Sequence, residues 1–461
     1  MNMQVTISPV DGREVVRREL ASPQQLEALL AQAKAAQAGW RAMPLADRAA
    51  LVSQGVDRFV EHKSQIAEEL TLQMGRPLRY TPNEVDGFAA RARHMIGIAE
   101  QALAPITPAL ASGFTRFIAR EPWGTVLVIA PWNYPLLTAV NAVVPALVAG
   151  NTVLLKHSAQ TPLAAERMVQ AFVEAGVPEE VFQFVHCDHE ATQRMIASPG
   201  VDYVCFTGSV SGGAAVERAA AGRFIGVGLE LGGNDPAYVR SDADLQQAVE
   251  SIVDGAFFNS GQSCCGIQRV YVHQSHYPAF VEAAVALTQQ YVLDDPLQPA
   301  TTLGPLVRSA AADAVRQVVR QAVLQGARPL VDARCFQRDR PGTPYLAPQI
   351  LAQVDHSMRV MADECFGPVF GVMPVTGDDE ALALMNDSPY GLTAALFTRD
   401  EEAARALGAR LETGTVFMNR CDVLDPALAW AGVKHTGRGV TLSVLGYEQL
   451  TRPKSYHFKH L

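Results

Sequence analysis

The fold class is decided by the stretch Thr125-Val126-Leu127-Val128-Ile129-Ala130-Pro131-Trp132-Asn133-Tyr134-Pro135. Its first six residues are a continuous apolar run, which is the pattern of a strand buried on both faces of a parallel sheet. A helical pattern over residues 136–148 and a second apolar run over residues 152–155 follow directly. A strand, a helix and a strand in this succession predict a βαβ unit, and therefore an α/β fold with a wound parallel sheet.

Before this stretch, helical periodicity fills most of the first hundred residues, and a half-exposed strand pattern follows it. Ser22 and Gln25 have the spacing of a capping box, and Pro23 between them suits a first helical position. We predict helices over residues 22–41, 45–72 and 84–101, and a strand over residues 113–120.

After this stretch the alternation continues and then starts a second time. The first series continues with a helix over residues 162–175 and strands over 181–186 and 203–206. The second series has helices over residues 245–258, 277–291 and 310–325, and strands over 269–273, 369–375 and 394–398. We therefore expect a second α/β domain that begins near Pro236, with the working site in the cleft between the two domains.

The composition excludes several classes of protein. Hydrophobic residues make up 48% of the 461 residues and charged residues 18%, which argues against disorder. The net charge of −9 disfavours a nucleic-acid partner, and no apolar run approaches the length of a membrane span. Seven cysteines, an odd number, argue for a reducing compartment, and the N-terminal residues lack the apolar core of a secretion signal. We expect a soluble cytoplasmic protein.

Two residues have surroundings that favour covalent and acid–base chemistry. Cys264 lies among small residues where a helix runs into a glycine-containing break, which leaves a thiol accessible as a nucleophile. Glu230 lies between leucines beside paired glycines, where burial would favour a general base. Taken alone, each has an ordinary alternative: a buried structural cysteine and a surface-loop glutamate. The neighbouring Cys265 does not make a zinc site, because no further cysteine pair stands at ligand spacing, and we expect no metal.

Two turns at strand ends complete the set of candidate motifs. The turn from Thr207 to Gly213 follows a strand and precedes a helix, so its amides suit a phosphate, although glycines also serve ordinary turns. Asn133 lies between two prolines that stiffen its turn, so its side chain suits a preorganised hydrogen-bond donor, although a plain Asx turn explains it equally well when taken alone.

Taken together, in this order and spacing, these stretches resemble the aldehyde dehydrogenase superfamily. The resemblance extends over nearly the whole chain. It includes the stretches at residues 155–162 (LKHSAQTP), 295–306, 364–368 (ECFGP) and 386–392 (NDSPYGL). It implies a Rossmann-variant nucleotide-binding domain (residues 1–110 and 123–235), an α/β catalytic domain (236–445) and a small β oligomerisation arm (111–122 and 446–461). The arm, with strands around 115–121 and 455–461, implies a homodimer or homotetramer.

The resemblance also implies an activity, the NAD- or NADP-dependent oxidation of an aldehyde, a semialdehyde being one candidate, to a carboxylic acid. Cys264 forms a thiohemiacetal and then a thioester, Asn133 binds the oxyanion, and Glu230 activates the hydrolytic water. Lys156 is expected at the adenosine ribose, Ser209 at the pyrophosphate and Glu364 at the nicotinamide ribose. The full set of implied cofactor contacts is Trp132, Lys156, Ser158, Thr207, Gly208, Ser209, Gly213, Leu231, Glu364 and Phe366. The expected substrate pocket is Tyr134, Thr138, Asn141, Leu424 and Trp430.

Some positions depart from the commonest pattern of the superfamily. Ala159 stands where many NAD-preferring members have a glutamate, which leaves room for the 2′-phosphate of NADP. Ala142 and Thr441 replace a lysine and a glutamate that many members pair near the catalytic base, so the proton must leave Glu230 by another route. Trp430 replaces the usual phenylalanine. Arg420, near the same funnel, is either a contact for a substrate carboxylate or a surface residue.

Three other functions remain as alternatives. A CoA-acylating enzyme would pass the thioester to coenzyme A, but such enzymes generally lack the base Glu230. A non-catalytic binding or structural member of the fold would not need Cys264, Glu230 and Asn133 together. A cysteine hydrolase would need an activating histidine, and none of the eleven histidines lies in a matching motif.

Overall fold

The apolar run Thr125–Ala130 forms β4, which lies inside a six-stranded sheet and is buried along its whole length. The computed structural model describes residues 3–461. The strand order is β18-β8-β7-β4-β5-β6, and all neighbours are parallel except β18. The other strands are β5 (Thr152–His157), β6 (Phe182–Phe184), β7 (Tyr203–Thr207), β8 (Gly226–Glu230) and β18 (Gly437–Arg438). The predicted α/β class is confirmed.

The order of these strands places several of the predicted site residues on one edge. From β4 the chain winds outward through β5 and β6, then returns to the other side of β4 for β7 and β8. Ligands of wound parallel sheets bind at the carboxyl ends of the strands, where the winding reverses. The turns that contain Trp132, Ser158 and Ser209 follow β4, β5 and β7 at this edge.

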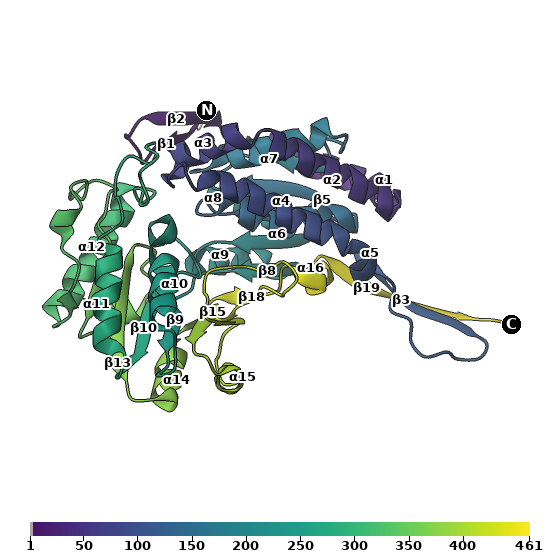
Figure 1. The fold of residues 1–461 in the computed structure, drawn as a ribbon. Helices are drawn as coiled ribbons and strands as arrows, with labels where there is room; N and C mark the ends of the chain where they lie inside the picture. Colours follow the sequence, from purple (N-terminus) through teal and green to yellow (C-terminus); the bar gives the residue numbers. More distant parts are fainter. Residues whose placement is uncertain (1–2) are drawn as a thin grey trace.

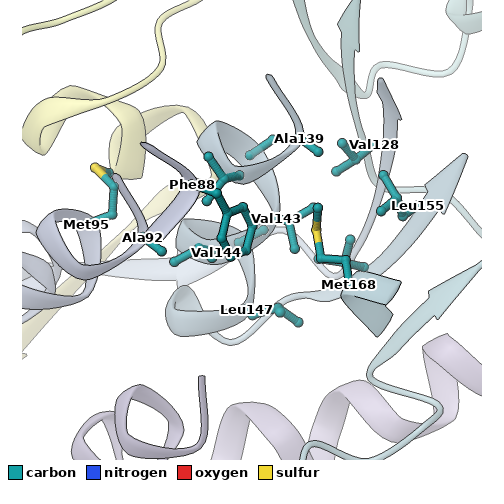
Figure 2. Close-up of a cluster of buried hydrophobic side chains, with 14 of the residues drawn as sticks. Phe88, Ala92, Met95, Val128, Ala139, Val143, Val144, Leu147, Leu155 and Met168 are labelled. Carbon is teal, nitrogen blue, oxygen red and sulfur yellow. The ribbon is translucent and has the colours of Figure 1, made fainter. Parts of the chain in front are cut away.

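Helices cover this first sheet, and α6 (Pro135–Ala149) is the most deeply buried of them. Nearly every residue of α6 is apolar and buried, which is typical of a helix in the middle of a core. Figure 2 shows Val143 and Val144 of α6 among side chains that include Phe88, Val128 and Leu155. The helices associated with this sheet are α1 (Pro23–Ala42), α2 (Leu45–Glu61), α3 (Lys63–Met74), α4 (Thr81–Gly97), α5 (Ala99–Leu103), α7 (Pro162–Glu174), α8 (His189–Ala197), α9 (Val210–Ala220) and α16 (Ser443–Gln449).

A second, seven-stranded sheet has the order β11-β12-β13-β10-β9-β15-β16 and is parallel except at β11. Its strands are β9 (Asp235–Val239), β10 (Ile267–His273), β11 (Arg328–Pro329), β12 (Gln349–Ala352), β13 (Val369–Val375), β15 (Thr393–Phe397) and β16 (Thr415–Met418). Its helices are α10 (Leu245–Phe257), α11 (Tyr277–Thr288), α12 (Ser309–Leu324), α13 (Arg359–Ala362), α14 (Asp378–Asn386) and α15 (Glu401–Gly408). These elements occupy the green lower-left part of Figure 1. Because β9 begins five residues after Glu230, the end of β8 connects the two sheets directly.

A two-stranded antiparallel ribbon projects from the body of the molecule (Figure 1). It consists of β3 (Phe114–Pro122) and β19 (Thr451–Lys459), paired along their full lengths. The preceding helix α16 packs on the core, where the Tyr447 hydroxyl donates to the carbonyl of Met95 at 2.8 Å. The ribbon occupies the position predicted for the oligomerisation arm; that role and the three domain boundaries stay predictions.

The structure differs from the predicted elements in three main places. The single helix predicted over residues 84–101 is wrong: it is α4 and α5, separated by Ile98. The N-terminal residues form a hairpin of β1 (Met3–Ile7) and β2 (Glu14–Glu19), which the helical periodicity of the following region gave no reason to expect. The single helix predicted over residues 45–72 is wrong: it is α2 and α3, separated by His62, whose backbone leaves the helical conformation. The apolar spacing continues across this break, so the pattern alone does not show it.

The remaining elements are short, and no described helix has the length and apolar character of a membrane span. They are the 3-10 turns η1 (Phe258–Gly261) and η2 (Ala333–Cys335) and the paired strands β14 (Tyr390–Gly391) and β17 (Val433–Lys434).

Candidate active site

The loop that carries Cys264 has an unusual backbone. Asn259, Ser260 and Gly261 in η1 all have φ between 55° and 69°, a left-handed conformation that costs energy for residues with a side chain. At Gly261 a Cβ would lie 2.2 Å from the carbonyl oxygen of Gly367, so only glycine fits. The Ser260 hydroxyl donates to the carbonyl of Gly304 at 2.7 Å. The surroundings therefore fix this loop, which leaves Cys264 half-buried.

Asn133 is attached to the same loop. Its Nδ2 donates to the carbonyl oxygen of Gln262, two residues before Cys264, at 3.1 Å. In return, the Nδ2 of Asn259 donates to the Asn133 carbonyl at 3.2 Å. The side chain of Gln262 accepts from the amide of Val307 at 2.8 Å, which fixes the loop on its other side. The structure thus brings the predicted oxyanion donor and the predicted nucleophile together.

A buried ion pair that the sequence analysis missed supports both segments. Arg76 and Glu84 pair with side chains 2% and 0% exposed. Arg76 also donates through Nε to the Asn259 side chain at 3.0 Å and through a second nitrogen to the carbonyl of Asn133. Glu84 accepts from the amide of Leu136 at 2.9 Å, at the start of α6. The only sequence signal was a charged residue in Gly75-Arg76-Pro77, which reads as an ordinary turn.

Glu230, the last residue of β8, is held by two threonine hydroxyls. Thr441 donates to Oε1 at 2.6 Å and Thr207 donates to Oε2 at 3.1 Å. Burial raises the pKa of the Glu230 carboxyl, while these two hydrogen bonds and the charge of Arg91 act in the opposite direction. Thr207 was predicted to contact the cofactor; here its hydroxyl contacts the predicted base.

The segment after Glu230 lies against the cysteine loop. A Cβ at Gly233 would lie 2.1 Å from the carbonyl oxygen of Cys264, so the glycine permits this close approach. The amide of Gly233 donates to the Glu364 carboxyl at 3.0 Å, and a Cβ at Gly232 would lie 2.4 Å from the same carboxyl. Burial raises the pKa of Glu364 to about 7. The segment after Glu230, the loop that carries Cys264 and the Glu364 carboxyl therefore meet at one place.

The predicted phosphate turn begins α9 as expected. Ser209 is its N-cap and accepts from the amide of Gly212 at 3.1 Å. No acidic residue lies in the first turn, so the free amides there present a positive potential. Leu231 packs against the same turn, because a Cβ at Gly213 would lie 2.6 Å from its side chain. Gly208 donates its amide to the carbonyl of Glu230 at 3.0 Å.

The remaining predicted cofactor residues lie around this edge. Lys156, at the end of β5, is buried, and burial lowers the pKa of its ammonium group; the charge of Asp188 acts in the opposite direction. Ser158 closes a turn by accepting from the amide of Gln160 at 3.2 Å. The rings of Trp132 and Phe366 meet edge to face at 5.7 Å, which joins the turn after β4 to the segment before β13.

The residues predicted for the substrate pocket have different surroundings. The Tyr134 ring lies under the Arg76 guanidinium at 4.5 Å, and its buried hydroxyl has no partner among the described residues. Thr138 donates to the carbonyl of Tyr134 at 2.8 Å. Asn141 is buried and accepts from Arg91 at 3.3 Å. Trp430 is buried in the core that Cys264 contacts, and Leu424 packs on that core.

Two further residues bear on this pocket. Arg420 is exposed, whereas Asp422, which the sequence analysis did not single out, lies beneath the cysteines. The Cys265 thiol donates to the Asp422 carboxyl at 2.8 Å and the Ser263 hydroxyl at 3.3 Å. Burial raises the pKa of Asp422 to about 7. Among residues 3–461 no group of three or more acidic, histidine or cysteine side chains is placed to hold a metal.

Comparison with known proteins agrees with this arrangement. The sequence model of the aldehyde dehydrogenase family matches residues 2–456. The NADP-type succinate-semialdehyde dehydrogenase of Deinococcus radiodurans is 34% identical over 449 residues, 97% of this chain and 93% of the relative. The betaine aldehyde dehydrogenase of Agrobacterium fabrum is 32% identical over 453 residues, 98% of this chain and 92% of the relative. The structure of NADP-dependent glyceraldehyde-3-phosphate dehydrogenase from Bacillus halodurans, in complex with NADP, matches with a TM-score of 0.94 at 32% identity, covering 100% of this chain and 96% of that chain. This chain belongs to the aldehyde dehydrogenase family.

Proposed function

We propose that this protein oxidises an aldehyde to a carboxylic acid with NAD or NADP as the oxidant. The observation that carries the proposal is the convergence on the Cys264 loop of two segments distant in sequence. Asn133 donates to Gln262 in that loop, and Gly233, three residues after Glu230, lies against the carbonyl of Cys264. A nucleophile, an oxyanion donor and a base in one place are the groups that acyl transfer requires.

The first half of the reaction uses Cys264 and Asn133. The thiolate attacks the aldehyde carbon, and the oxyanion of the thiohemiacetal needs hydrogen-bond donors. Asn133 carries two N–H donors on Nδ2, of which one is committed to Gln262, so the second is free for the oxyanion together with the Cys264 amide. The nicotinamide of the bound cofactor supplies the hydride acceptor. The thioester that remains on Cys264 is the intermediate.

The second half uses Glu230. As a carboxylate it removes a proton from a water molecule that attacks the thioester, which releases the acid and restores the thiol. The raised pKa of this buried carboxyl suits a general base near neutral pH. The retained base also distinguishes this proposal from transfer of the acyl group to coenzyme A.

The residues at the carboxyl edge of the first sheet fit a dinucleotide. The turn after β7 packs closely on the Phe206 ring and needs its glycines, since a Cβ at Gly208 or Gly212 would lie 2.7 Å from that ring. The free amides at the start of α9 suit the pyrophosphate. Lys156 and Ser158 would hold the adenosine ribose or its 2′-phosphate, and Glu364 the other ribose.

The substrate we propose is an aldehyde that also carries an anionic group. Arg91 of α4 is the supporting residue: it donates to Asn141 at 3.3 Å and to the carbonyl of Leu137 at 2.8 Å, and no carboxylate of residues 3–461 lies within ion-pair distance of it. Arg91 therefore replaces Arg420 as the candidate partner of a substrate carboxylate. A guanidinium without an ion pair favours a semialdehyde over a cationic aldehyde such as betaine aldehyde.

The proposed assembly is a cytoplasmic homodimer or homotetramer. A two-stranded ribbon is only marginally stable alone, and β3 with β19 projects from the body (Figure 1); among the described residues, the outer edge of β3 pairs only at Ile118, with Ile106. Addition of this ribbon to a sheet of a second copy would cover its outer edges. All seven cysteines are free thiols, as a reducing compartment requires.

One experiment tests the proposed activity, cofactor and substrate together. The purified protein is mixed with succinate semialdehyde, betaine aldehyde and unsubstituted aldehydes, each with NAD and with NADP, and the reduced cofactor is followed by absorbance. We expect oxidation without added coenzyme A and a preference for the semialdehyde. No reaction with any aldehyde would refute the proposed activity, and a dependence on coenzyme A would favour the acylating alternative. Equal rates for both charge types would remove Arg91 from substrate selection.

A further inference from the structure

We propose that Thr441 and Thr207 are positioning residues for Glu230, and that a small cavity beside them conducts the proton from Glu230 to the surface at Arg438 and Gly439. The inference rests on the proposed function, because it assigns the proton route of the second half-reaction. It concerns the two positions, Ala142 and Thr441, where the sequence lacks the charged pair expected near the base.

The backbones around Glu230 are fixed, so its position is set by its side-chain contacts. The Glu230 carbonyl accepts from Gly208 at 3.0 Å, and Glu230 is paired with Gly437 of β18. Thr207 is its neighbour in register on β7. Thr441 is held by two backbone hydrogen bonds with Trp430, at 2.8 and 2.9 Å. Each hydroxyl donates to a different oxygen of the carboxylate, which favours one orientation of the group.

A cavity of about 20 Å³ adjoins this carboxylate. That volume exceeds the roughly 10–15 Å³ that one water molecule needs, and three hydroxyl groups supply polar partners for it. The lining residues used in this argument are Thr138, Ala142, Thr207, Glu230, Arg438 and Thr441. The small side chain of Ala142 helps to leave this space open. Arg438 and Gly439, which also line it, are exposed, so the cavity leads toward solvent.

The proton transfer balances without a further reagent. Glu230 takes a proton from the attacking water on Oε1, and the Thr441 hydroxyl turns its O–H from Oε1 toward the cavity water. Oε1 then donates its proton to Thr441 Oγ1, which releases its own proton to that water. The cavity water passes a proton to solvent at Arg438, and Glu230 returns to the carboxylate. The hydroxyl thus accepts one proton and loses one.

The other titratable groups that face Glu230 are few. Arg91 approaches from α4 and favours the ionised carboxylate, and Cys205 lies on β7 beside Thr207. Arg438 on β18 pairs with Glu217 at 3.0 Å at the exposed end of the cavity. Because the two hydroxyls stabilise the ionised form of Glu230, loss of one raises the pKa of the base. The base acts only when it is ionised. Loss of one threonine hydroxyl therefore moves the acidic limb of the pH–rate profile to higher pH.

The test compares Thr441→Val with Thr441→Ser in two assays, aldehyde oxidation and hydrolysis of a nitrophenyl ester, which needs no cofactor. For Thr441→Val we expect a normal burst of reduced cofactor and a steady-state rate roughly tenfold lower. The acidic limb of its pH–rate profile should shift to higher pH by about one unit. Thr441→Ser should recover most of both. Thr207→Val should shift the limb in the same direction, and Ala142→Val, which fills the cavity, should lower the rate without removing a hydroxyl.

Thr288→Val is the matched control, because it also removes a buried threonine hydroxyl, one that donates to Ala284 at 2.7 Å in α11. It should leave rate and pH profile unchanged. A wild-type pH profile in both Thr441→Val and Thr207→Val would overturn the positioning role, and a full rate in Ala142→Val would overturn the route. If the wild type cleaves the ester but oxidises no aldehyde, the proposed function fails while these measurements still decide the inference.

Discussion

The loop that carries Cys264 and the strand that ends at Glu230 are constrained to very different degrees. The loop is fixed by left-handed residues, by the Arg76–Glu84 ion pair and by buried amide contacts from Asn133 and Val307. The carboxylate of Glu230 has two hydroxyl partners and a small cavity beside it.

This difference follows from what each group does. A nucleophile and its oxyanion donors act best when they are held in place before the substrate arrives, because reorganisation then adds nothing to the barrier. A general base must also lose its proton once per cycle, so it needs a route to solvent. We therefore expect substitutions in the loop to lower the free energy of unfolding and the rates of both half-reactions. Substitutions near Glu230 should lower only the rate of thioester hydrolysis.

The largest expected effect is that of Cys264→Ala, which should abolish both aldehyde oxidation and esterase activity. No other residue forms the covalent intermediate, and cofactor binding should survive because Cys264 lies outside the glycine turn. The measurements are turnover and cofactor binding by fluorescence titration.

The matched control is Cys265→Ser, which replaces the neighbouring buried thiol by a hydroxyl that can still donate to Asp422. It should retain activity within a few-fold. Normal turnover in Cys264→Ala would show that Cys264 is not the nucleophile.

Glu230→Gln should lower steady-state turnover by roughly 10²–10⁴-fold and leave a rapid burst of reduced cofactor. Acylation does not need the carboxylate, whereas activation of water does. Stopped-flow measurement of the burst separates the two halves. A variant that loses the burst and the steady state equally would show that Glu230 acts on the nucleophile as well, and the contrast between the two regions would disappear.

Arg76→Met should lower the free energy of unfolding by about 3–5 kcal/mol, because it leaves the Glu84 charge buried without a partner. Denaturant unfolding gives this value. Arg93→Met is the matched control, since Arg93 pairs with Asp57 at the surface, 54% and 57% exposed, and should cost less than about 1 kcal/mol. Equal losses in the two variants would refute the role of Arg76 in supporting the loop.

The sequence predicted those features that depend on neighbouring residues. The bounds of β4 are those of its apolar run, and the capping box at Ser22 and Gln25 forms both of its hydrogen bonds, at 2.8 and 3.3 Å. Local spacing determines such features. The resemblance to aldehyde dehydrogenases is confirmed, while the individual roles of its site residues stay predictions.

The supporting contacts could not be predicted in this way, because they join segments that only the fold brings together. Arg76 contacts Asn259 across 183 residues of sequence, and Asp422 accepts from Cys265 across 157. Neither residue stands in a pattern that distinguishes it from a surface charge. The same reason explains Thr207: its cofactor contact stays a prediction, and its place in a glycine turn gave no sign that its register beside Glu230 turns the hydroxyl to the base.

The smallest expected effect lies outside both regions, at the edge that should hold the adenosine ribose. Ala159→Glu should lower the ratio of NADP to NAD in kcat/KM by roughly ten- to a hundredfold, which corresponds to about 1–3 kcal/mol. The new carboxylate would stand at an exposed position, three residues after the buried Lys156, and would repel the 2′-phosphate there. Both cofactors are measured at saturating aldehyde in wild type and variant.

Asp188→Asn gives the opposite test at the same edge. The charge of Asp188 acts on Lys156, and its side chain caps α8 by accepting from Ala191 at 2.8 Å. Asparagine can keep this cap and removes the charge, so the fold is preserved. The NADP to NAD ratio should rise a few-fold. Opposite shifts in the two variants would place cofactor choice at Lys156. If the ratio changes in neither variant, cofactor choice lies in the turn after β7. There the backbone amides would contact the cofactor, and neither substitution changes them.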